Sequence, residues 1–203
     1  MAQFSRRRFI QAGLAVPLAA ATGARLLAAH QGGLGQFTGS SPAPPPCTNT
    51  RTATPAVAAS DYKAKAPVRS SLIDPGMTGP KLTISGAVIG LTCGNVKGAT
   101  VELWHADGRG LYDAAGFKFR GQQVTDKDGK YTFATIAPGA VAGRAKRVNA
   151  KITVPGKTTL TTQLFFSDDP LHAKDPAFKP ELLLTITGPA DNRAAAFDFI
   201  LNI

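Results

Sequence analysis

The chain has 203 residues, of which 43% are hydrophobic and 18% charged, and this balance excludes a wholly disordered protein. Its 21 glycines and 15 prolines disfavour an all-helical bundle, and two cysteines are too few for a disulfide scaffold or a four-thiolate zinc site. The first 29 residues hold four arginines and no acid, so the formal net charge of +10 falls to +6 for the rest. The remaining basic residues are scattered over strand-like segments, and we therefore expect no nucleic-acid binding.

Residues 1–29 have the pattern of an export signal. Arginines at 6, 7 and 8 precede an apolar stretch from Ala12 to about Ala29. A twin arginine before a modest apolar run is typical of the bacterial Tat pathway. Glycine, proline and arginine residues interrupt the stretch, which makes it a poor membrane span because a span needs ~20 apolar residues. We expect cleavage near Ala29, a periplasmic or secreted location and membrane contact only during export; the alternative is a short helix of the mature domain.

Residues 30–80 are predicted to form an extended, proline-rich arm. Eight of the 15 prolines fall between Pro42 and Pro80, and the segment has no apolar periodicity. A composition of this kind favours an extended chain over regular secondary structure. Cys47 lies in this arm, and in an oxidising compartment it can form a disulfide with Cys93 or remain one of two separate thiols.

Residues 81–203 are predicted to form the folded domain. Turn signals such as the one at 126–129 separate short segments in which apolar and polar residues alternate. The predicted strands are residues 82–88, 99–104, 131–136, 148–154, 160–166, 182–187 and 196–203. Seven or more short strands without a convincing helix indicate an all-β fold, an antiparallel β-sandwich with the arm attached at its N-terminal side.

Several motifs in this domain point to one family. The run from Val101 to Tyr112, with its Trp-His-Ala-Asp core, closely resembles the signature of the intradiol ring-cleavage dioxygenases. The segments at 119–121, 129–133, 135–138 and 160–166 fit the same family in order and spacing. A transthyretin-like module shares some of these segments, but it does not explain the run up to Tyr112. The resemblance extends from about Cys47 to Ile203 and implies a sandwich fold that acts on aromatic diols.

The resemblance also implies four positions for ligands of a non-haem Fe(III), which the family holds with two tyrosines and two histidines. Those positions carry Tyr112, Val141, Arg147 and Asn149, so only the first keeps its ligand. Valine offers no donor atom, and an asparagine amide replaces imidazole poorly on ferric iron. A guanidinium stays protonated and repels the metal. We therefore expect no cofactor, and Fe(III) only if the family chemistry survives at a rebuilt site.

Two positions beside the metal in the family are matched by Arg144 and Gln163. Together with Tyr112 and Arg147 they are predicted to line a cationic pocket for a small aromatic or anionic ligand. A second version of this hypothesis has Arg147 hydrogen-bonded to Tyr112 in an empty site. Arg147 and Asn149 lie two residues apart on a predicted strand, so they share one face, which should be the former metal face.

The residues therefore support an exported, intradiol dioxygenase-like protein that serves as a non-catalytic binding or partner protein. One alternative is a working dioxygenase, an oxidoreductase that adds both atoms of O2 to a catechol-type substrate at a rebuilt iron site. Another is a structural or interaction module, as a homo-oligomer or in a hetero-oligomer with an intact homologue. A family resemblance does not establish chemistry where the site has changed, so the ligand positions argue against catalysis.

Overall fold

A computed structural model describes residues 51–92, 94–157 and 159–203, and their regular secondary structure is almost entirely β. Two single 3₁₀ turns, η1 (His172–Lys174) and η2 (Pro180–Leu182), lie between the sixth and seventh strands. The strands of the described residues are β1 (Lys81–Gly90), β2 (Thr100–Trp104), β3 (Arg120–Val124), β4 (Lys130–Ile136), β5 (Arg147–Thr153), β6 (Leu160–Phe166), β7 (Leu183–Thr187), β8 (Asn192–Ala196) and β9 (Phe199–Leu201). The predicted all-β fold is confirmed. No helix among these residues has the length and apolar character needed to cross a membrane.

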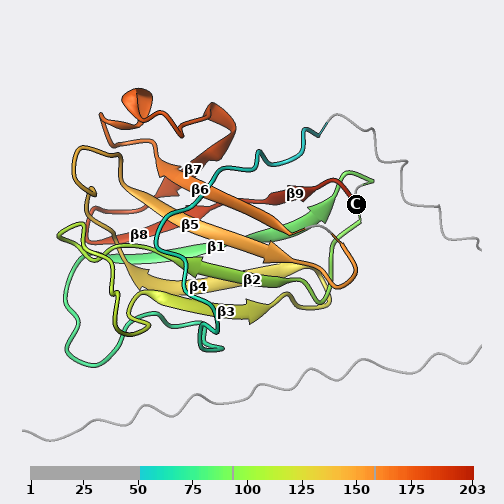
Figure 1. The fold of residues 1–203 in the computed structure, drawn as a ribbon, viewed down its shortest axis with the longest axis horizontal. Helices are drawn as coiled ribbons and strands as arrows, with labels where there is room; N and C mark the ends of the chain where they lie inside the picture. Colours follow the sequence, from blue (N-terminus) through green and yellow to red (C-terminus); the bar gives the residue numbers. More distant parts are fainter. Residues whose placement is uncertain (1–50, 93, 158) are drawn as a thin grey trace, which may run out of the picture. The chain divides into compact units, whose positions relative to one another are not determined.

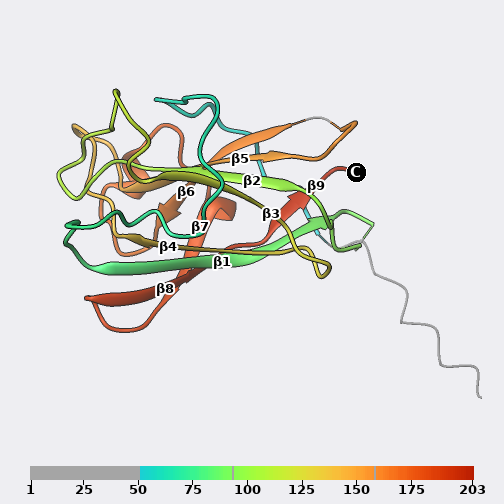
Figure 2. The same cartoon turned by 90° about the horizontal axis from the view of Figure 1, so that it is seen from below.

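The strands form one curled sheet in the order β3-β2-β5-β6-β7-β8-β1-β4, with β9 paired to β1. The sheet folds over so that β2 and β5 lie in one layer and β1 and β4 in the other (Figures 1 and 2). Most neighbours are antiparallel, as predicted, but β1 is parallel to β8 and β9, and β6 is parallel to β7. The sandwich is therefore a mixed one. Its parallel partners are joined by crossover connections, because a hairpin can join only antiparallel strands.

The core fills the space between the two layers. In β4 the side chains alternate, with Tyr131 and Phe133 buried while Lys130 and Thr132 are exposed. Strands of both layers contribute inward-facing aliphatic and aromatic residues to one cluster. Burying a side chain of the size of Phe133 stabilises the fold by about 1.5–3 kcal/mol, so this alternation is what holds the layers together.

Residues 51–80, the described part of the arm, follow an extended path. Residues 55–60 cross the outer face of the layer that contains β2, β5 and β6 (Figure 1), and residues 68–72 run beside β3 and β4. Side chains of that layer donate hydrogen bonds to main-chain oxygens of the arm. The Trp104 Nε1–H donates to Ser60 O (2.9 Å), and Gln163 Nε2 donates to Ala58 O (2.8 Å). The export signal, residues 30–50 and both members of the proposed Cys47–Cys93 pair lie outside the described residues.

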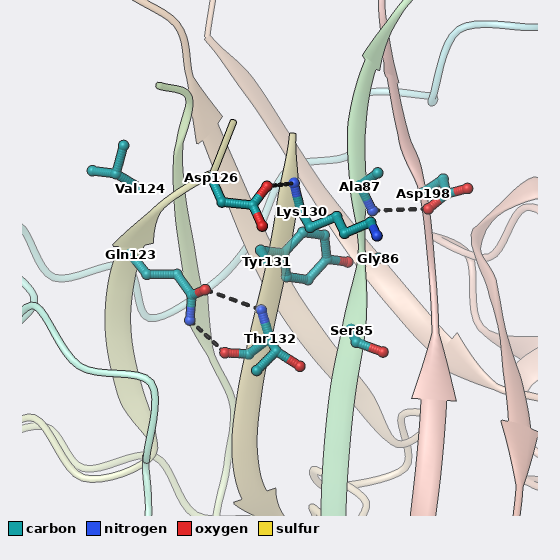
Figure 3. A pocket seen from close by; sticks show the side chains of 10 residues that line it. All are labelled: Ser85, Gly86, Ala87, Gln123, Val124, Asp126, Lys130, Tyr131, Thr132 and Asp198. Atoms are coloured by element: carbon teal, nitrogen blue, oxygen red, sulfur yellow. Dashed lines mark hydrogen bonds between the residues drawn. The ribbon is translucent and has the colours of Figure 1, made fainter. Parts of the chain in front are cut away.

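The outer edge of β4 is covered by groups that do not belong to a strand. The Thr132 N–H donates to the Gln123 side-chain oxygen (3.0 Å), and the Gln123 amide donates back to Thr132 O (Figure 3). The Gln123 side-chain amide therefore takes the place that the backbone of a neighbouring strand would occupy beside Thr132. The edge is covered on either side as well, by Asp126 against Lys130 and by arm residues 70–72 against Ala134.

Candidate functional site

β5 carries the two positions that hold histidines in the family pattern. Arg147 and Asn149 are 3% and 0% exposed, on the face of β5 opposite the core residue Val148. The strand register aligns Asn149 with Trp104 of β2 and with Gln163 of β6. Since aligned residues of neighbouring strands point to the same side, these side chains form one row beneath the arm.

Tyr112 is hydrogen-bonded to Asn149. The Asn149 Nδ2 atom lies 2.9 Å from Tyr112 Oη and 3.3 Å from the main-chain oxygen of Trp104. Because a carbonyl oxygen can only accept, the NH2 end of the amide must face Trp104, and the Tyr112 oxygen accepts from it. Among the described residues Arg147 donates to Ala145 O and to Asp175, and no hydrogen bond joins it to Tyr112.

Arg144 and Arg147 both bind the carboxylate of Asp175. Arg144 donates from Nε (2.8 Å) and Nη2 (2.7 Å), and Arg147 donates from Nη1 at 3.2 Å. The backbone N–H groups of Ala145 and Ala177 also donate to this carboxylate. Burial alone would raise the pKa of Asp175, but the bonds from Arg144 and the two backbone groups outweigh it and lower the pKa to about 2. One of the two cationic charges is thus neutralised internally.

Val141 lies in the loop between β4 and β5. A Cβ built on Gly110 would lie 3.3 Å from the Val141 Cα and 2.0 Å from the main-chain oxygen of Ala140. This loop is therefore packed directly against the backbone of the segment that carries Tyr112. The fold brings the four family ligand positions into one region even though three of them have changed.

The residues at these positions do not fit a ferric ion. Val141 has no donor atom, and Arg147 is protonated and paired with Asp175. The Asn149 amide directs its N–H toward Tyr112, and its Oδ1, which has no partner, is the one donor atom left free at the three changed positions. Within residues 51–203, as far as they are described, no group of three or more His, Cys, Asp or Glu side chains is arranged to hold a metal. The side chains at the family's ligand positions therefore belong to an internal network of hydrogen bonds and an ion pair.

Next to this network, the loop after β2 is fixed by buried hydrogen bonds. His105 Nδ1 lies 2.7 Å from Ala106 O and must donate to it, so Nε2 accepts from Thr135 Oγ1, also at 2.7 Å. Burial of this neutral ring lowers the pKa of His105 to about 4, against weaker opposing effects of Ala106 O and of the Asp107 charge. The Asp107 carboxylate accepts from the backbone N–H groups of Arg109 and Leu111 at 2.9 Å. These contacts hold the loop that presents Tyr112.

Tyr112 lines two adjacent cavities, and the arm contributes to the larger one. The larger has a volume of about 320 Å³ and is lined by Asp61, Tyr62, Lys63, Tyr112, Asp113, Ala114 and Arg120. The smaller measures about 200 Å³ and is lined by Asp107, Leu111, Tyr112, Asp113, Lys118 and Phe119. Another cavity, of about 650 Å³, lies away from this region on the outer side of β1 and β4 (Figure 3).

Arg120 is a functional candidate that the sequence did not reveal. It is 3% exposed, and none of the ion pairs among the described residues includes it. Its Nη2 donates to Asp61 O at 2.6 Å, whereas its Nε and Nη1 have no partner. Burial lowers the pKa of Arg120, and the charges of Glu102 and Asp61 oppose this shift. Arg120 lies in the segment 119–121 that fits the family pattern, but that fit assigned it no role in a site.

Glu102 and Gln163 complete the buried polar row. Each is almost fully buried and each has one side-chain oxygen without a partner. Burial raises the pKa of Glu102, against the opposing charges of Lys151 and Arg120. Gln163, one of the predicted pocket residues, donates from Nε2 to Ala58 O of the arm.

Comparison with known proteins identifies relatives of this chain. The family model described as Dioxygenase matches residues 52–203. Catechol 1,2-dioxygenase 1 of Acinetobacter lwoffii is 32% identical over 142 residues, which cover 57% of this chain and 46% of the relative. The protocatechuate 3,4-dioxygenase beta chain of Burkholderia cepacia is 31% identical over 119 residues, covering 50% and 51% respectively. The chain thus spans about half the length of these curated relatives.

Solved structures show the same architecture. The dioxygenase domain of a dioxygenase and carbohydrate-binding protein fusion from Streptomyces sp. SirexAA-E is 38% identical, with a TM-score of 0.72 over 75% of this chain and 99% of that one. Hydroxyquinol 1,2-dioxygenase from Pseudomonas putida DLL-E4 is 20% identical, with a TM-score of 0.67 over 75% and 68%, and so supports the fold alone.

Proposed function

The chain belongs to the intradiol ring-cleavage dioxygenase family, and on this premise we propose that it is a non-catalytic member that binds a small aromatic ligand beside Tyr112. The supporting observation is the polar network at the ligand positions: Asn149 bonds Tyr112, and Arg147 bonds Asp175. Ring opening in the family depends on a ferric ion that binds the diol and polarises it toward O2. Side chains that are already bonded to one another do not supply that ion with ligands.

The first test is metal content of the purified protein together with its visible absorption spectrum. We expect a colourless protein without stoichiometric iron and without turnover of catechol. Stoichiometric iron with a tyrosinate-to-iron absorption band would overturn the proposal and restore the alternative of a rebuilt dioxygenase site. As a matched control, the triple variant V141Y/R147H/N149H restores the family ligands, and iron uptake by this variant alone would assign the loss to these positions.

We also propose that the protein is exported, because residues 1–29 have the pattern of a Tat signal. The test is fractionation of a bacterial host that expresses the full chain, beside a variant in which Arg6 and Arg7 are replaced by lysine. We expect the unaltered protein in the periplasm or medium and the variant in the cytoplasm. Equal distribution of the two proteins would refute export by this route.

A second candidate function is that of a partner subunit. The relative from Burkholderia cepacia is described as a beta chain, so it forms part of a protein with more than one kind of chain. A subunit without iron ligands could support a homologue that keeps them. Size analysis of the purified protein, alone and mixed with an intact homologue, tests this, and a size unchanged by mixing would argue against it.

A further inference from the structure

We infer that residues 58–66 of the arm form a strap that opens and closes over the polar outer face of β2, β5 and β6 while the sandwich itself stays folded. The closed strap excludes solvent and solutes from that face, and the open strap admits them. The inference goes beyond the proposed function and does not rest on it, because it concerns the contacts of the arm and requires neither iron nor a ligand.

Main-chain hydrogen bonds anchor the strap at its two ends. Before it, the Val57 N–H donates to Thr161 O (3.0 Å), and after it the Arg69 N–H donates to Gln122 O (3.0 Å). Between these two anchors, no main-chain N–H donates a hydrogen bond to any of the described residues. Backbone without regular pairing opens at a lower free energy than paired strands do, so residues 58–66 can move without the strands beside them.

Within the strap, the hydrogen bonds to the sandwich come from side chains. The main-chain oxygens of Ala58, Ser60, Asp61 and Ala66 accept them at distances of 2.6 to 2.9 Å. The donors are, in the same order, Gln163 Nε2, Trp104 Nε1, Arg120 Nη2 and Gln122 Nε2. When the strap moves away, these donors and oxygens can bond water, so the bonds are exchanged on opening and not simply lost.

The closed strap is strained at two points. Asp61 and Lys65 have φ angles of 57° and 66°, and Phe119 is the one other non-glycine among the described residues with a positive φ. L-amino acids rarely adopt this left-handed region, because their Cβ then lies too close to the following carbonyl oxygen. Opening lets both residues return to ordinary backbone angles, which favours the open form.

The face beneath the arm holds buried polar atoms that the closed form leaves unsatisfied. Six buried side-chain nitrogen and oxygen atoms among the described residues lack a hydrogen-bond partner, on Glu102, Arg120, Arg147, Asn149 and Gln163. The strand register places all five side chains on the same face of the layer, opposite the core. Because a buried polar group without a partner is costly, access of water to this face favours the open strap.

Two neighbouring side chains of the strap oppose these effects and hold it closed. The Tyr62 ring lies 5.3 Å from the Trp104 ring, and the Tyr62 hydroxyl accepts from Lys151 Nζ at 2.8 Å. The Lys63 ammonium donates to Ala115 O at 2.6 Å. Tyr62 is exposed and Lys63 partly exposed, so water competes for both contacts. The strap is therefore held closed by latches that can break while the core stays intact.

Trp104 reports the state of the strap. It is the only tryptophan in the chain and is fully buried, and its indole N–H donates to Ser60 O of the strap. We would measure hydrogen exchange of this indole N–H by NMR in the purified protein, together with exchange of the main-chain amides of β1, β2 and β4. We expect the indole protection factor to be at least about 100-fold below those of the strand amides. Low concentrations of urea should leave it unchanged, because opening a short strap exposes little surface.

Variants assign the opening to the latches. We expect the indole protection factor to fall about 5- to 50-fold in K63A and about 2- to 10-fold in Y62F, which loses only the bond to Lys151, while the amides of β2 keep their protection. The matched control K157A removes an exposed lysine from the turn between β5 and β6 and should leave every rate unchanged. Acrylamide quenching of Trp104 fluorescence is a second readout, which should increase in K63A and Y62F.

Three outcomes would overturn the inference. An indole N–H as strongly protected as the amides of β1 and β4 would show that only global unfolding exposes Trp104. Protection lost together with the amides of β2 would show that the whole layer opens. Equal rates in K63A, Y62F and K157A would show that Tyr62 and Lys63 do not hold the strap. Metal content and ligand binding enter none of these outcomes, so the proposed function stands or fails separately.

Discussion

The two segments that carry the family's metal-ligand positions differ in how closely they match the family pattern. The segment from Trp104 to Tyr112 retains the family pattern, and its buried His105 is bonded to Ala106 O of the same segment and to Thr135 of β4. The segment at 141–149 departs from the pattern at each ligand position, and Arg147 is bonded to Asp175 instead. Residues that support the backbone fit the fold with or without iron. The ligand positions at 147 and 149 instead carry side chains that bond Asp175 and Tyr112, and each keeps one buried polar atom without a partner.

The largest expected effect comes from removing the carboxylate that completes the changed segment. In D175A the Arg147 side chain, 2% exposed, would keep its charge without a partner. Breaking a buried ion pair in this way costs about 3–5 kcal/mol in the free energy of unfolding, measured by urea denaturation. The control D168A breaks an exposed pair with Arg193 and should cost about 0–1 kcal/mol. Equal losses in the two variants would show that the network does not stabilise the segment.

The retained segment should give the protein a pH-dependent stability. The pKa of His105 is about 4 in the folded protein against an ordinary value of 6.5, so the unfolded chain takes up the proton first. The free energy of unfolding should therefore be highest above pH 6.5 and fall by about 3 kcal/mol as the pH drops from 6.5 to 4. In H105Q, whose amide can still donate to Ala106 O and accept from Thr135, this decrease should largely disappear. An unchanged pH dependence in H105Q would contradict the assignment.

The bonds between Asp175 and the changed segment should make the free energy of unfolding depend on pH in a lower range than His105 does. The pKa of Asp175 is lowered from 3.8 to about 2, so its stabilisation is complete above pH 3.8 and is lost as the pH falls through this interval. We expect a further decrease of about 2 kcal/mol between pH 4 and 2, measured by urea denaturation. The decrease should be absent in D175N, and its persistence there would assign it to another carboxylate.

A smaller effect is expected at the contact between the two segments. N149A removes the bonds to Tyr112 and to Trp104 O, and it should lower the free energy of unfolding by about 1–2 kcal/mol. The control N202A alters an exposed asparagine near the C-terminus and should have almost no effect. A loss in N149A no larger than in N202A would show that the contact is dispensable for stability.

The smallest effect is expected at Gln163, which matches the family pattern but here bonds the arm. Q163L loses the bond to Ala58 O, yet it also removes a buried oxygen that has no partner. Because these two changes oppose each other, we expect a shift of less than about 1 kcal/mol in the free energy of unfolding. A large loss would mean that the arm depends on this one amide.

Most strands could be predicted because the alternation of apolar and polar residues shows directly which face of a strand is buried. β3 was missed: its residues Gly121 to Gln123 carry no apolar alternation, since the strand lies at a sheet edge against the arm. Within the predicted strand at 196–203 only β9 (Phe199–Leu201) forms, whereas β8 (Asn192–Ala196) ends where the prediction began and was otherwise missed. There the Phe197 carbonyl occupies the space beside Gly86, only 1.7 Å from where a Cβ would lie, and accepts from the Tyr131 hydroxyl. The parallel pairs were also unpredictable, because local patterning does not specify which strands become neighbours.

The candidate site could be predicted only in part. Spacing placed Arg147 and Asn149 on one face, because side chains two residues apart on a strand point the same way. Their partners were not readable from spacing: Asp175 lies 28 residues beyond Arg147 and outside the family motifs. Arg120 lies within the family segment at 119–121, but its lack of an ion pair is a property of the folded surroundings and could not be predicted from the segment.

The covered edge of β4 has a consequence for solubility. A free strand edge offers backbone groups to which another chain can add a strand, which is a common route to aggregation. The outward-facing backbone groups of Lys130, Thr132 and Ala134 are bonded already, by Asp126, the Gln123 amide and the arm. A neighbouring chain would have to displace these groups before it could extend the sheet, so one glutamine and a length of arm protect the sandwich from polymerising through this edge.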